Sequence, residues 1–466
     1  MTTTAIDALR SIWSENGLPE DSLAYICLSD AKPVLPSSFH VGVAAQTSIG
    51  AAALAAAEVW YQRTGQRQRV NVDMHDAEYE CTGHFTIDSS MPKLWAKLSG
   101  LYPCGEGYVR IHANFDHHRD GVLKILGLTA GDATKRNEVL AALSKWGAQE
   151  FETVASEAGL VVSKVRSFDA WDKHPQAQAL AKLPLLSIDN IGDAHAQALP
   201  KLSRGAQPLT GIRVLDLTRI LAGPTCGRVL AAYGADVMLV NSPNLPNIAH
   251  IMDTSRGKLS AIVDLETQKG CSDLHNLLRE ADVIVQSYRP GGLERFGFGA
   301  EELAKKYHGL IYVSLSTYSH AGPWAAKRGF DSLVQTATGF NHAEAESASS
   351  EVPKALPVQI LDYATGFFMA YAVQAALLRR ASEGGSWHIR VSLAQTSQWL
   401  RGLGRIGFDH HAAAVDYASR LKTYLSGYGE LKCMPHAAKF STIRVDQGRP
   451  SVPPGTHEPV WPDKRG

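Results

Sequence analysis

The chain has 466 residues, which is more than one hydrophobic core usually serves, so we expect two or more domains. Hydrophobic residues make up 45% and charged residues 20%, as in an ordinary globular protein in solution. The 46 Lys and Arg residues equal the 46 Asp and Glu residues, and this zero net charge argues against a nucleic-acid-binding protein, which usually has a basic excess.

The cysteines and the apolar segments bear on the compartment. The six cysteines are scattered and none forms a CxxC pair, so we expect neither a metal site nor a disulfide framework. No segment reaches the roughly 18 uninterrupted apolar residues of a membrane-spanning helix. These features predict a cytoplasmic protein that has no membrane or nucleic-acid partner.

The N-terminal part mixes helix with short strands. Alanine-rich residues from Ile49 to Trp60 predict a helix. Short strands are expected at Val70–Met74, Tyr108–His112 and Leu160–Ser163, because β-branched and aromatic residues gather there. Residues Ala196–Thr210 have the composition of a linker.

From Gly211 onward, expected strands alternate with helices. The strands are Ile212–Leu217, Ala235–Val240, Ser260–Asp264, Asp282–Gln286 and Leu310–Leu315. Pro224 opens the first helix, as proline does at a first helical position. This alternation predicts an α/β fold with a doubly wound parallel sheet, whose ligands bind at the carboxyl ends of the strands.

Several familiar catalytic signatures are missing. The sequence has no Walker loop, no GxSxG and no HExxH. The turn after the first strand, Ala222–Gly227, is not the GxGxxG of dinucleotide binding, so a dehydrogenase is poorly supported. Close packing of helix on strand is the other role open to Gly223 and Gly227.

Basic residues lie near the expected ends of the strands. They are Arg219, Arg256, Lys258, Arg289, Arg295, Lys327 and Arg328. Singly, each is most simply a solvated surface charge. Together they would meet at one edge of the sheet and could hold phosphate, because arginine gives charge-assisted, bidentate hydrogen bonds to phosphate oxygens. Coenzyme A, with its diphosphate and 3′-phosphate, is one candidate ligand.

Asp362 stands between an apolar run, Ala355–Leu361, and a hydrophobic helix. Aspartate is a favoured N-cap residue, which is a purely structural role. A carboxylate at a helix N-terminus is also stabilised as an anion by the macrodipole. An ionised carboxylate can act as the nucleophile in covalent catalysis on an acyl group, so both roles can hold together.

The segment around Asp362 resembles an earlier segment of the chain. Gln46–Gly50 is followed by an alanine-rich helix, Arg63 and a strand, and Asp362–Gly366 is followed by an apolar helix, Arg379 and a strand. If this is a repeat, the first copy has Gln46 where the second has Asp362. Only the second copy then offers a carboxylate.

Ordered motifs in the second half resemble the family III CoA-transferases, also called the CaiB/BaiF family. The matching segments are Gly211–Pro224, Gly234–Val237, Arg256–Lys258, Asp264–Leu265, Ala281–Val285, Arg289–Gly297, Gly322–Pro323, Gly329–Asp331 and Asp362–Gly366. The resemblance is strong from about Gly211 to Leu393.

The N-terminal part resembles the later half of the same family. Thr64–Ala77 resembles the segment after the catalytic helix, Tyr102–Val109 the start of the small domain, and Val165–Pro175 its tail. We therefore expect residues 1–205 to correspond to that later half, including the small domain. Residues 206–466 would be the Rossmann-like CoA-binding catalytic part with a C-terminal tail. A tandem fusion that lost its first head, or a permutation, would produce this order.

The resemblance implies a Rossmann-like doubly wound parallel sheet, a smaller α+β domain and interlaced homodimers. It implies acyl-CoA and a carboxylic acid as substrates, with coenzyme A as a substrate or cosubstrate rather than a tightly bound cofactor. Asp362 is implied as the nucleophile. The residues implied in CoA binding are Arg219, Ala222, Gly223, Arg256, Lys258, Arg289, Arg295, Arg328 and Phe330.

In the implied reaction, the Asp362 carboxylate attacks the donor thioester to give a mixed anhydride, and the CoA thiolate then converts the anhydride to an aspartyl-CoA thioester. The family also contains α-methylacyl-CoA racemases, which pair the matching aspartate with a histidine. Here that position is Phe330, which cannot exchange a proton, and His320 lies ten residues earlier. Transferase is therefore favoured over racemase or epimerase. A non-catalytic CoA-binding pseudoenzyme is a third reading, against which the retained Asp362 argues.

Overall fold

A seven-stranded sheet forms the centre of the computed structural model, which describes residues 4–407, 416–445 and 448–463. Its strand order is β10-β9-β8-β11-β12-β13-β7, and all neighbours are parallel except the edge strand β7, which runs antiparallel to β13. The strands are β7 (Leu186–Gly192), β8 (Arg213–Leu217), β9 (Asp236–Asn241), β10 (Leu259–Ile262), β11 (Val283–Gln286), β12 (Ile311–Ser316) and β13 (Ser386–Ser392).

The strand order makes this sheet doubly wound. From β8 the chain adds β9 and β10 on one side, then crosses to add β11, β12 and β13 on the other. The order therefore reverses between β8 and β11, and ligands bind at the carboxyl ends of the strands beside such a reversal. This confirms the predicted Rossmann-like α/β fold. The helices of this part are α9 (Ala222–Ala232), α10 (Ile251–Thr254), α11 (Gln268–Leu278), α12 (Ala300–Lys306), α13 (Asp331–Thr338), α14 (Phe340–Ser347), α15 (Ile360–Glu383) and α16 (Leu393–Gly402), with a short 3-10 helix at Glu294–Phe296.

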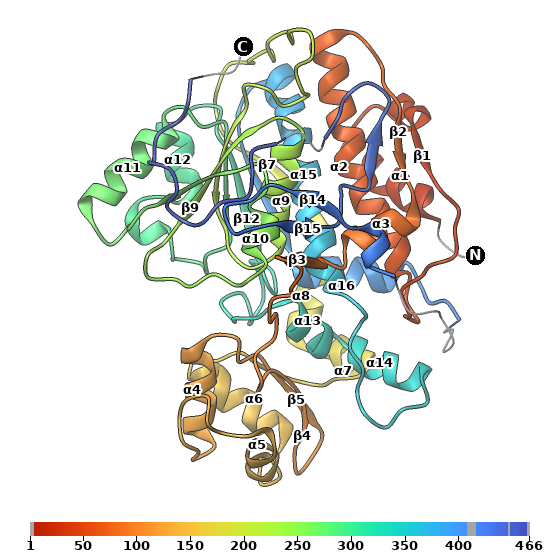
Figure 1. The fold of residues 1–466 in the computed structure, drawn as a ribbon, viewed down its shortest axis with the longest axis vertical. Helices are drawn as coiled ribbons and strands as arrows, with labels where there is room; N and C mark the ends of the chain where they lie inside the picture. The colour runs from red at the N-terminus through yellow and green to blue at the C-terminus, as the bar shows by residue number, and fades with distance from the viewer. Residues whose placement is uncertain (1–3, 408–415, 446–447, 464–466) are drawn as a thin grey trace.

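Two long helices pack side by side in the core, α15 and α2 (Val41–Thr64), each of 24 residues (Figure 1). The small side chains of α2 permit a close approach, and the Gln374 amide donates to the carbonyl oxygen of Ala52 at 3.0 Å. Both helices are long and apolar enough to cross a membrane. The sequence did not predict this, because polar residues interrupt the apolar run in each helix. Both are wholly buried inside the protein, as the core helix of a non-membrane protein also is, so they are weak evidence for membrane insertion.

The N-terminal segment packs around α2. It comprises α1 (Ala5–Glu15), a 3-10 helix (Glu20–Tyr25), β1 (Ile26–Leu28), β2 (Val70–Val72) and α3 (Met74–Glu80). Gln46 lies inside α2, and its amide donates to the carbonyl oxygens of Ser29 at 3.0 Å and Val72 at 2.9 Å. The residue that echoes Asp362 therefore ties its helix to the strands beside it.

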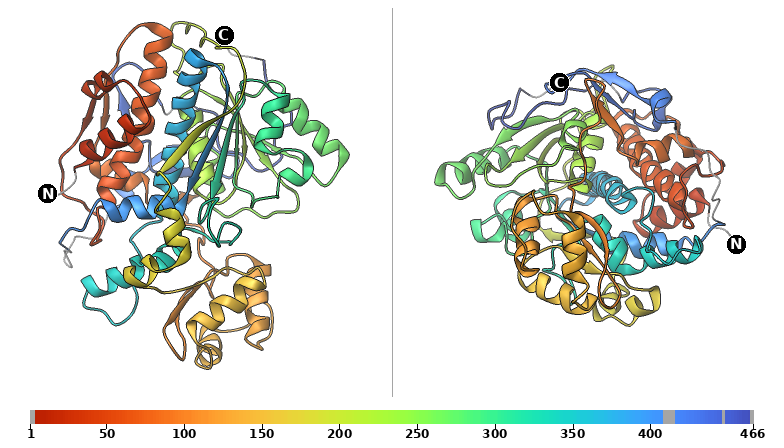
Figure 2. Two further views of the ribbon diagram at one scale, coloured as in Figure 1. Left: turned by 180° about the vertical axis from the view of Figure 1, so that it is seen from behind. Right: turned by 60° about the horizontal axis from the view of Figure 1, so that its bottom comes forward.

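A small domain stands apart below the large sheet (Figures 1 and 2). Its antiparallel sheet contains β4 (Gly100–Pro103), β5 (Tyr108–Ile111) and β6 (Val162–Lys164), and its helices are α4 (Asp116–Ile125), α5 (Arg136–Leu143) and α6 (Ala148–Glu157). Tyr102, Leu123 and Phe151 are fully buried in its separate core. The predicted smaller α+β domain is thus confirmed. Helices α7 (Phe168–Asp172) and α8 (Pro175–Leu180) lead from it to β7.

The C-terminal segment returns to the N-terminal part, as the dark blue ribbon in Figure 1 shows. It contains a 3-10 helix (Ala418–Arg420), β14 (Lys422–Tyr424), β15 (Leu431–Cys433) and β16 (Ala438–Phe440). Strand β15 pairs with β3 (Phe85–Ile87), and β16 pairs with β2. The two ends of the chain are therefore interwoven.

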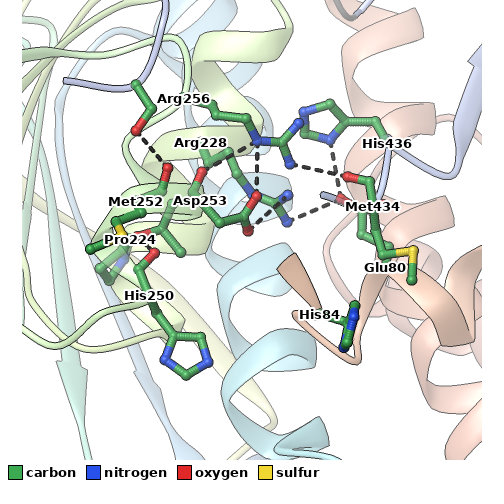
Figure 3. A network of polar contacts seen from close by, with 12 residues as sticks. Glu80, His84, Pro224, Arg228, His250, Met252, Asp253, Arg256, Met434 and His436 are labelled. Carbon is green, nitrogen blue, oxygen red and sulfur yellow. Dashed lines mark hydrogen bonds and ion pairs between the residues drawn. The ribbon is translucent and has the colours of Figure 1, made fainter. Parts of the chain in front are cut away.

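A buried ionic network also joins these parts (Figure 3). Arg228 of α9 pairs with Glu80 of α3 at 3.0 Å and with Asp253 of α10 at 3.7 Å. Arg256 pairs with Asp253 at 3.0 Å, and the His436 ring lies 3.1 Å from Glu80. Burial raises the pKa of Glu80, but the charges of His436 and Arg228 outweigh it and hold that pKa below its ordinary value. A charge removed here would leave its partner buried and unpaired.

We expect Glu80→Gln to lower the free energy of unfolding by about 3–5 kcal/mol, because breaking one side of a buried ion pair strands the other charge. Urea denaturation followed by circular dichroism measures it. The matched control is Glu430→Gln, which breaks the exposed pair with Lys432 and should change stability by less than about 1 kcal/mol. Equal effects of the two substitutions would contradict a structural role for the network.

Candidate active site

Asp362 is the third residue of α15 and is only 7% exposed. It does not cap the helix, because Gln359 holds the cap position, so the N-cap expectation is wrong. The backbone N–H of Asp362 instead donates to Oδ2 of Asp331 at 2.9 Å. The structure therefore brings two carboxyl groups together at the start of two helices.

Asp331, the first residue of α13, is the partner of Asp362. It is fully buried, and its Oδ1 accepts a hydrogen bond from the Gln335 amide at 2.5 Å. Burial raises the pKa of Asp331 to about 7, against the opposing hydrogen bonds from the Asp362 N–H and Gln335. Burial, and then the negative charge of Asp331, raises the pKa of Asp362 well above its ordinary value. The pair thus resists carrying two charges, and the helix macrodipole alone does not keep Asp362 ionised.

Small-domain side chains cover Phe330, which directly precedes Asp331. The His112 ring stacks on the Phe330 ring with centroids 4.0 Å apart, and the rings of Phe115 and His118 lie at 6.2 and 6.4 Å. Burial is the first cause that lowers the pKa values of His112 and His118 to about 3, so both imidazoles are neutral at physiological pH. The chain's own small domain therefore forms one wall beside the Asp331–Asp362 pair.

Arg110 lies on the same wall. It is two residues before His112 at the end of β5, so both side chains share a face of the strand, and its guanidinium is over the Trp95 ring at 5.5 Å. The side chain is 8% exposed, and Nε has no hydrogen-bond partner in the described part of the chain. Burial lowers the pKa of Arg110 to about 10, although the negative charge of Asp331 opposes this.

Three arginines, which we name the arginine cluster, lie at the carboxyl ends of the central strands: Arg219 after β8, Arg289 after β11 and Arg328 in the loop after β12. Burial, then the charges of Arg289 and Arg219, lowers the pKa of Arg328. Arg219 donates to the carbonyl oxygen of Pro246 at 2.7 Å. Within residues 4–407, 416–445 and 448–463, none of the three forms an ion pair with a carboxylate, so their mutual repulsion suits an anionic ligand.

Ala222 and Gly223 begin α9 beside this cluster, and both are buried. A Cβ on Gly223 would run into the side chain of Thr218, and a Cβ on Gly366 of α15 would meet the carbonyl oxygen of Ala222. Gly223 and Gly366 therefore let α9 pack closely on the end of β8 and on α15, the helix that carries Asp362.

The structure pairs the other predicted basic residues with carboxylates. Lys258 is fully buried, and its Nζ lies 2.8 Å from Asp216 and 2.8 Å from the carbonyl oxygen of Pro224. Arg256 belongs to the ionic network of Figure 3 and lies over the Tyr424 ring at 4.8 Å. Arg295 is exposed and pairs with Glu266. Lys327 pairs with Glu152 at 2.9 Å. These four cations have carboxylate partners, whereas the arginine cluster has none among the described residues.

Residues 209–408 match the model of the family described as CoA-transferase family III. This part of the chain belongs to CoA-transferase family III. The match confirms the resemblance seen in the sequence, and it includes Asp362, Asp331, Phe330 and the arginine cluster.

Relatives in this family include the acetyl-coenzyme A transferase nodX of Hypoxylon pulicicidum, which is 31% identical over 68% of this chain and 56% of its own length. The succinate–glutarate CoA-transferase of Agrobacterium fabrum is 35% identical over 40% of this chain and 51% of its own. A crystal structure of Rv3272 from Mycobacterium tuberculosis has 32% identity and a TM-score of 0.38, and covers 43% of this chain and 59% of that one. The chain spans about half the length of the curated relatives it matches.

Sequence reasoning missed the wall that faces the family III site. Arg110, His112 and His118 lie before residue 209, outside the matched region. A signal was present, because His112 and the pair His117–His118 cluster in a short segment right after an expected strand. Nothing in the sequence places that segment against Phe330.

Proposed function

We propose that the protein is a CoA-transferase that moves CoA from an acyl-CoA to a free carboxylic acid, with Asp362 as nucleophile. The observation that carries the proposal is the position of Asp362 in a buried pair with Asp331, next to Phe330 and within a family III region. The names of the relatives, which include succinate–glutarate CoA-transferase, support transfer of CoA between carboxylic acids. Coenzyme A would enter and leave as a substrate.

The proposed chemistry balances without an external proton donor or oxidant. An oxygen of the Asp362 carboxylate attacks the thioester carbonyl carbon, the C–S bond breaks, and a mixed anhydride and CoA thiolate form. The thiolate attacks the Asp362 carbonyl carbon and releases the first acid as its carboxylate. The second acid then reverses these steps. Each step has a good leaving group, whereas direct exchange does not.

The surroundings of Asp362 suit this role. A carboxylate that is hard to ionise is also a stronger base and is poorly solvated, so it attacks readily once its charge forms. The backbone N–H groups near the start of α15 can stabilise negative charge that develops on the carbonyl oxygens. Asp331, already engaged by Gln335 and the Asp362 N–H, would position Asp362 rather than react.

For CoA itself, we propose that the arginine cluster binds the phosphates and that Ala222, Gly223 and Phe330 border the path toward Asp362. Arg328 carries a buried Nε without a partner, as expected for a group that waits for a ligand. His118 is close to both Phe330 and the arginine cluster. Its ring contacts Phe330, and the charges of Arg328 and Arg219 act on it.

Arg328→Gln is expected to raise KM for the acyl-CoA by about tenfold or more, because one charge-assisted hydrogen bond is worth about 1.5–3 kcal/mol. The effect on kcat should be smaller, since the phosphates lie away from the reacting bond. Steady-state kinetics measure both. Arg279→Gln, which changes an exposed arginine that bonds only Asn276 in the described structure, is the control. Equal KM values for the two variants would count against the arginine cluster as the phosphate site.

A second candidate, α-methylacyl-CoA racemase or epimerase, gains one observation from the structure. Phe330 occupies the position of the expected histidine, but the His112 imidazole is stacked on it. A group with a pKa of about 3 is a weak proton acceptor at neutral pH, because an effective general base has a pKa near the working pH. Transferase therefore stays the better supported function.

One experiment separates these candidates from a non-catalytic CoA-binding protein. The purified protein is incubated with a panel of acyl-CoAs and free acids, quenched with hydroxylamine or borohydride, and analysed by mass spectrometry. Carboxylate-dependent CoA exchange with modification at Asp362 supports the transferase. Deuterium incorporation at the α-carbon without exchange supports the racemase. CoA binding with neither outcome supports the pseudoenzyme.

We also propose that residues 1–205 and 206–466 derive from two fused family III halves. Helices α2 and α15 have equal length, each is followed by a strand, and the two pack together. Interlaced homodimers and a cytoplasmic location remain part of the same proposal, and light scattering of the purified protein tests the first.

A further inference from the structure

Arg110 is a buried cation with unused hydrogen-bonding capacity. Its Nε is buried and has no hydrogen-bond partner among the described residues, and the side chain as a whole is 8% exposed. Burying a guanidinium without a hydrogen-bonded partner costs several kcal/mol, so such groups are rare unless a ligand completes them.

Asp331 is not the hydrogen-bond partner of Arg110. Its two carboxyl oxygens already accept hydrogen bonds from the Gln335 amide and the Asp362 N–H. Arg110 feels the negative charge of Asp331 but forms no ion pair with it, although β5 lies against α13. Arg110 therefore lies near Asp331, and its Nε–H is unpaired in the described part of the chain.

His112 extends this donor surface. Its Nδ1 is buried without a partner, and its ring is held by Phe330 on one side and by Trp95 at 6.0 Å on another. A neutral imidazole with a free nitrogen can donate one hydrogen bond. The two side chains point from the same face of one strand end, so both can bind a single ligand group.

We propose that Arg110 and His112 form a carboxylate-binding subsite beside Asp362, so that the acid substrate carries a second carboxylate group. This inference rests on the proposed transferase function and names its substrate class, a dicarboxylic acid and its mono-CoA thioester.

Of the two carboxylates of such an acid, the one that does not react is the better partner for Arg110. The reacting carboxylate loses its charge when it becomes part of the anhydride and then of the thioester. A buried guanidinium that held it would be left unpaired in the middle of the cycle. A distal carboxylate keeps its charge through every step, so the ion pair persists while the other end reacts.

Succinate and butyrate, which have equal chain length, are the probes. With acetyl-CoA as the common donor, the wild-type protein should use succinate at least tenfold better than butyrate, measured as kcat/KM of the acceptor. Arg110→Gln should lower the succinate-to-butyrate ratio at least tenfold. The ratio is measured within one preparation, so partial unfolding of a variant does not change it. Arg110→Lys keeps the charge and should keep part of the preference.

Arg136→Gln is the matched control. Arg136 is also a small-domain arginine over an aromatic ring, Tyr102 at 3.9 Å, but it bonds the Leu101 carbonyl oxygen away from Phe330. Its ratio should equal that of the wild type. Equal use of succinate and butyrate by the wild type, or an unchanged ratio in Arg110→Gln, overturns the subsite.

If no acid accepts CoA, the proposed function fails and the subsite is tested by binding alone. Calorimetric titration should then show that succinate binds the wild-type protein at least tenfold more tightly than butyrate, and that Arg110→Gln removes this difference. Succinate binding that is unaffected by Arg110→Gln also overturns the subsite.

Discussion

Asp362→Asn is expected to abolish CoA transfer while it raises the stability of the fold. The amide cannot form the anhydride, so the reaction loses its nucleophile, and we expect kcat to fall by at least about 10⁴-fold. The same change removes a charge that burial and Asp331 both disfavour. The free energy of unfolding should therefore rise by about 1 kcal/mol or more, as in other sites that trade stability for activity.

The measurements are acyl exchange under saturating substrate and thermal unfolding at pH 8. Asp7→Asn is the control, because Asp7 also lies in the first turn of a helix, α1, but is exposed. It should leave kcat unchanged and should not raise the melting temperature. An Asp362→Asn protein that still transfers CoA would exclude Asp362 as nucleophile. A fall in its melting temperature would show instead that the carboxylate supports the fold.

The sequence predicted β8 to β12 of the large sheet well, because each is a short, mostly apolar run. It did not predict the edge strand β7, which contains Ser187, Asp189 and Asn190. Strand β8 is one example, since its apolar residues follow Gly211 directly. The start of the next helix was placed less well, because α9 begins at Ala222 and Pro224 is its third residue rather than its first. Such local signals do not depend on tertiary contacts.

The ion pairs of the basic residues were not predicted, because a basic residue near a strand end can pair with a carboxylate of the protein or with a ligand. Lys258 and Arg256 look like Arg328 in the sequence. In the structure Asp216 neutralises the first, and Asp253 neutralises the second. Asp216 lies within an apolar strand and gives no sign that it faces Lys258. Only the three-dimensional arrangement shows which of these cations have a carboxylate partner within the protein.

The wall that carries Arg110 and His112 could not be predicted at all, because it comes from a different part of the chain. The family resemblance identified the start of the small domain but not the face it presents. The small domain that precedes the large sheet in this chain lies against the helix start that carries Asp331.

Activity is expected to rise with pH through neutrality, and Asp331→Asn should move that rise to lower pH. Transfer needs ionised Asp362, whose pKa is raised first by burial and then by the charge of Asp331. Removing that charge lowers the pKa of Asp362, and the side-chain oxygen of asparagine can still accept the Asp362 N–H. We expect the acid limb of kcat/KM to shift down by about 1 pH unit or more.

The stability of the wild type and of Asp331→Asn should depend on pH through the same two carboxyl groups. The pKa of Asp331 is raised to about 7, and that of Asp362 is also raised, so the folded protein binds protons more tightly than the unfolded chain does. The resulting penalty is fully present above the raised pKa values and disappears as pH falls toward about 4, the value in the unfolded chain. Asp331→Asn removes part of it, so its advantage in melting temperature over the wild type should grow between pH 5 and pH 8. Two results would show that the carboxyl groups of Asp331 and Asp362 do not repel each other as the structure indicates. One is an acid limb of kcat/KM that moves to higher pH in Asp331→Asn, and the other is a melting-temperature advantage of Asp331→Asn that shrinks as pH rises.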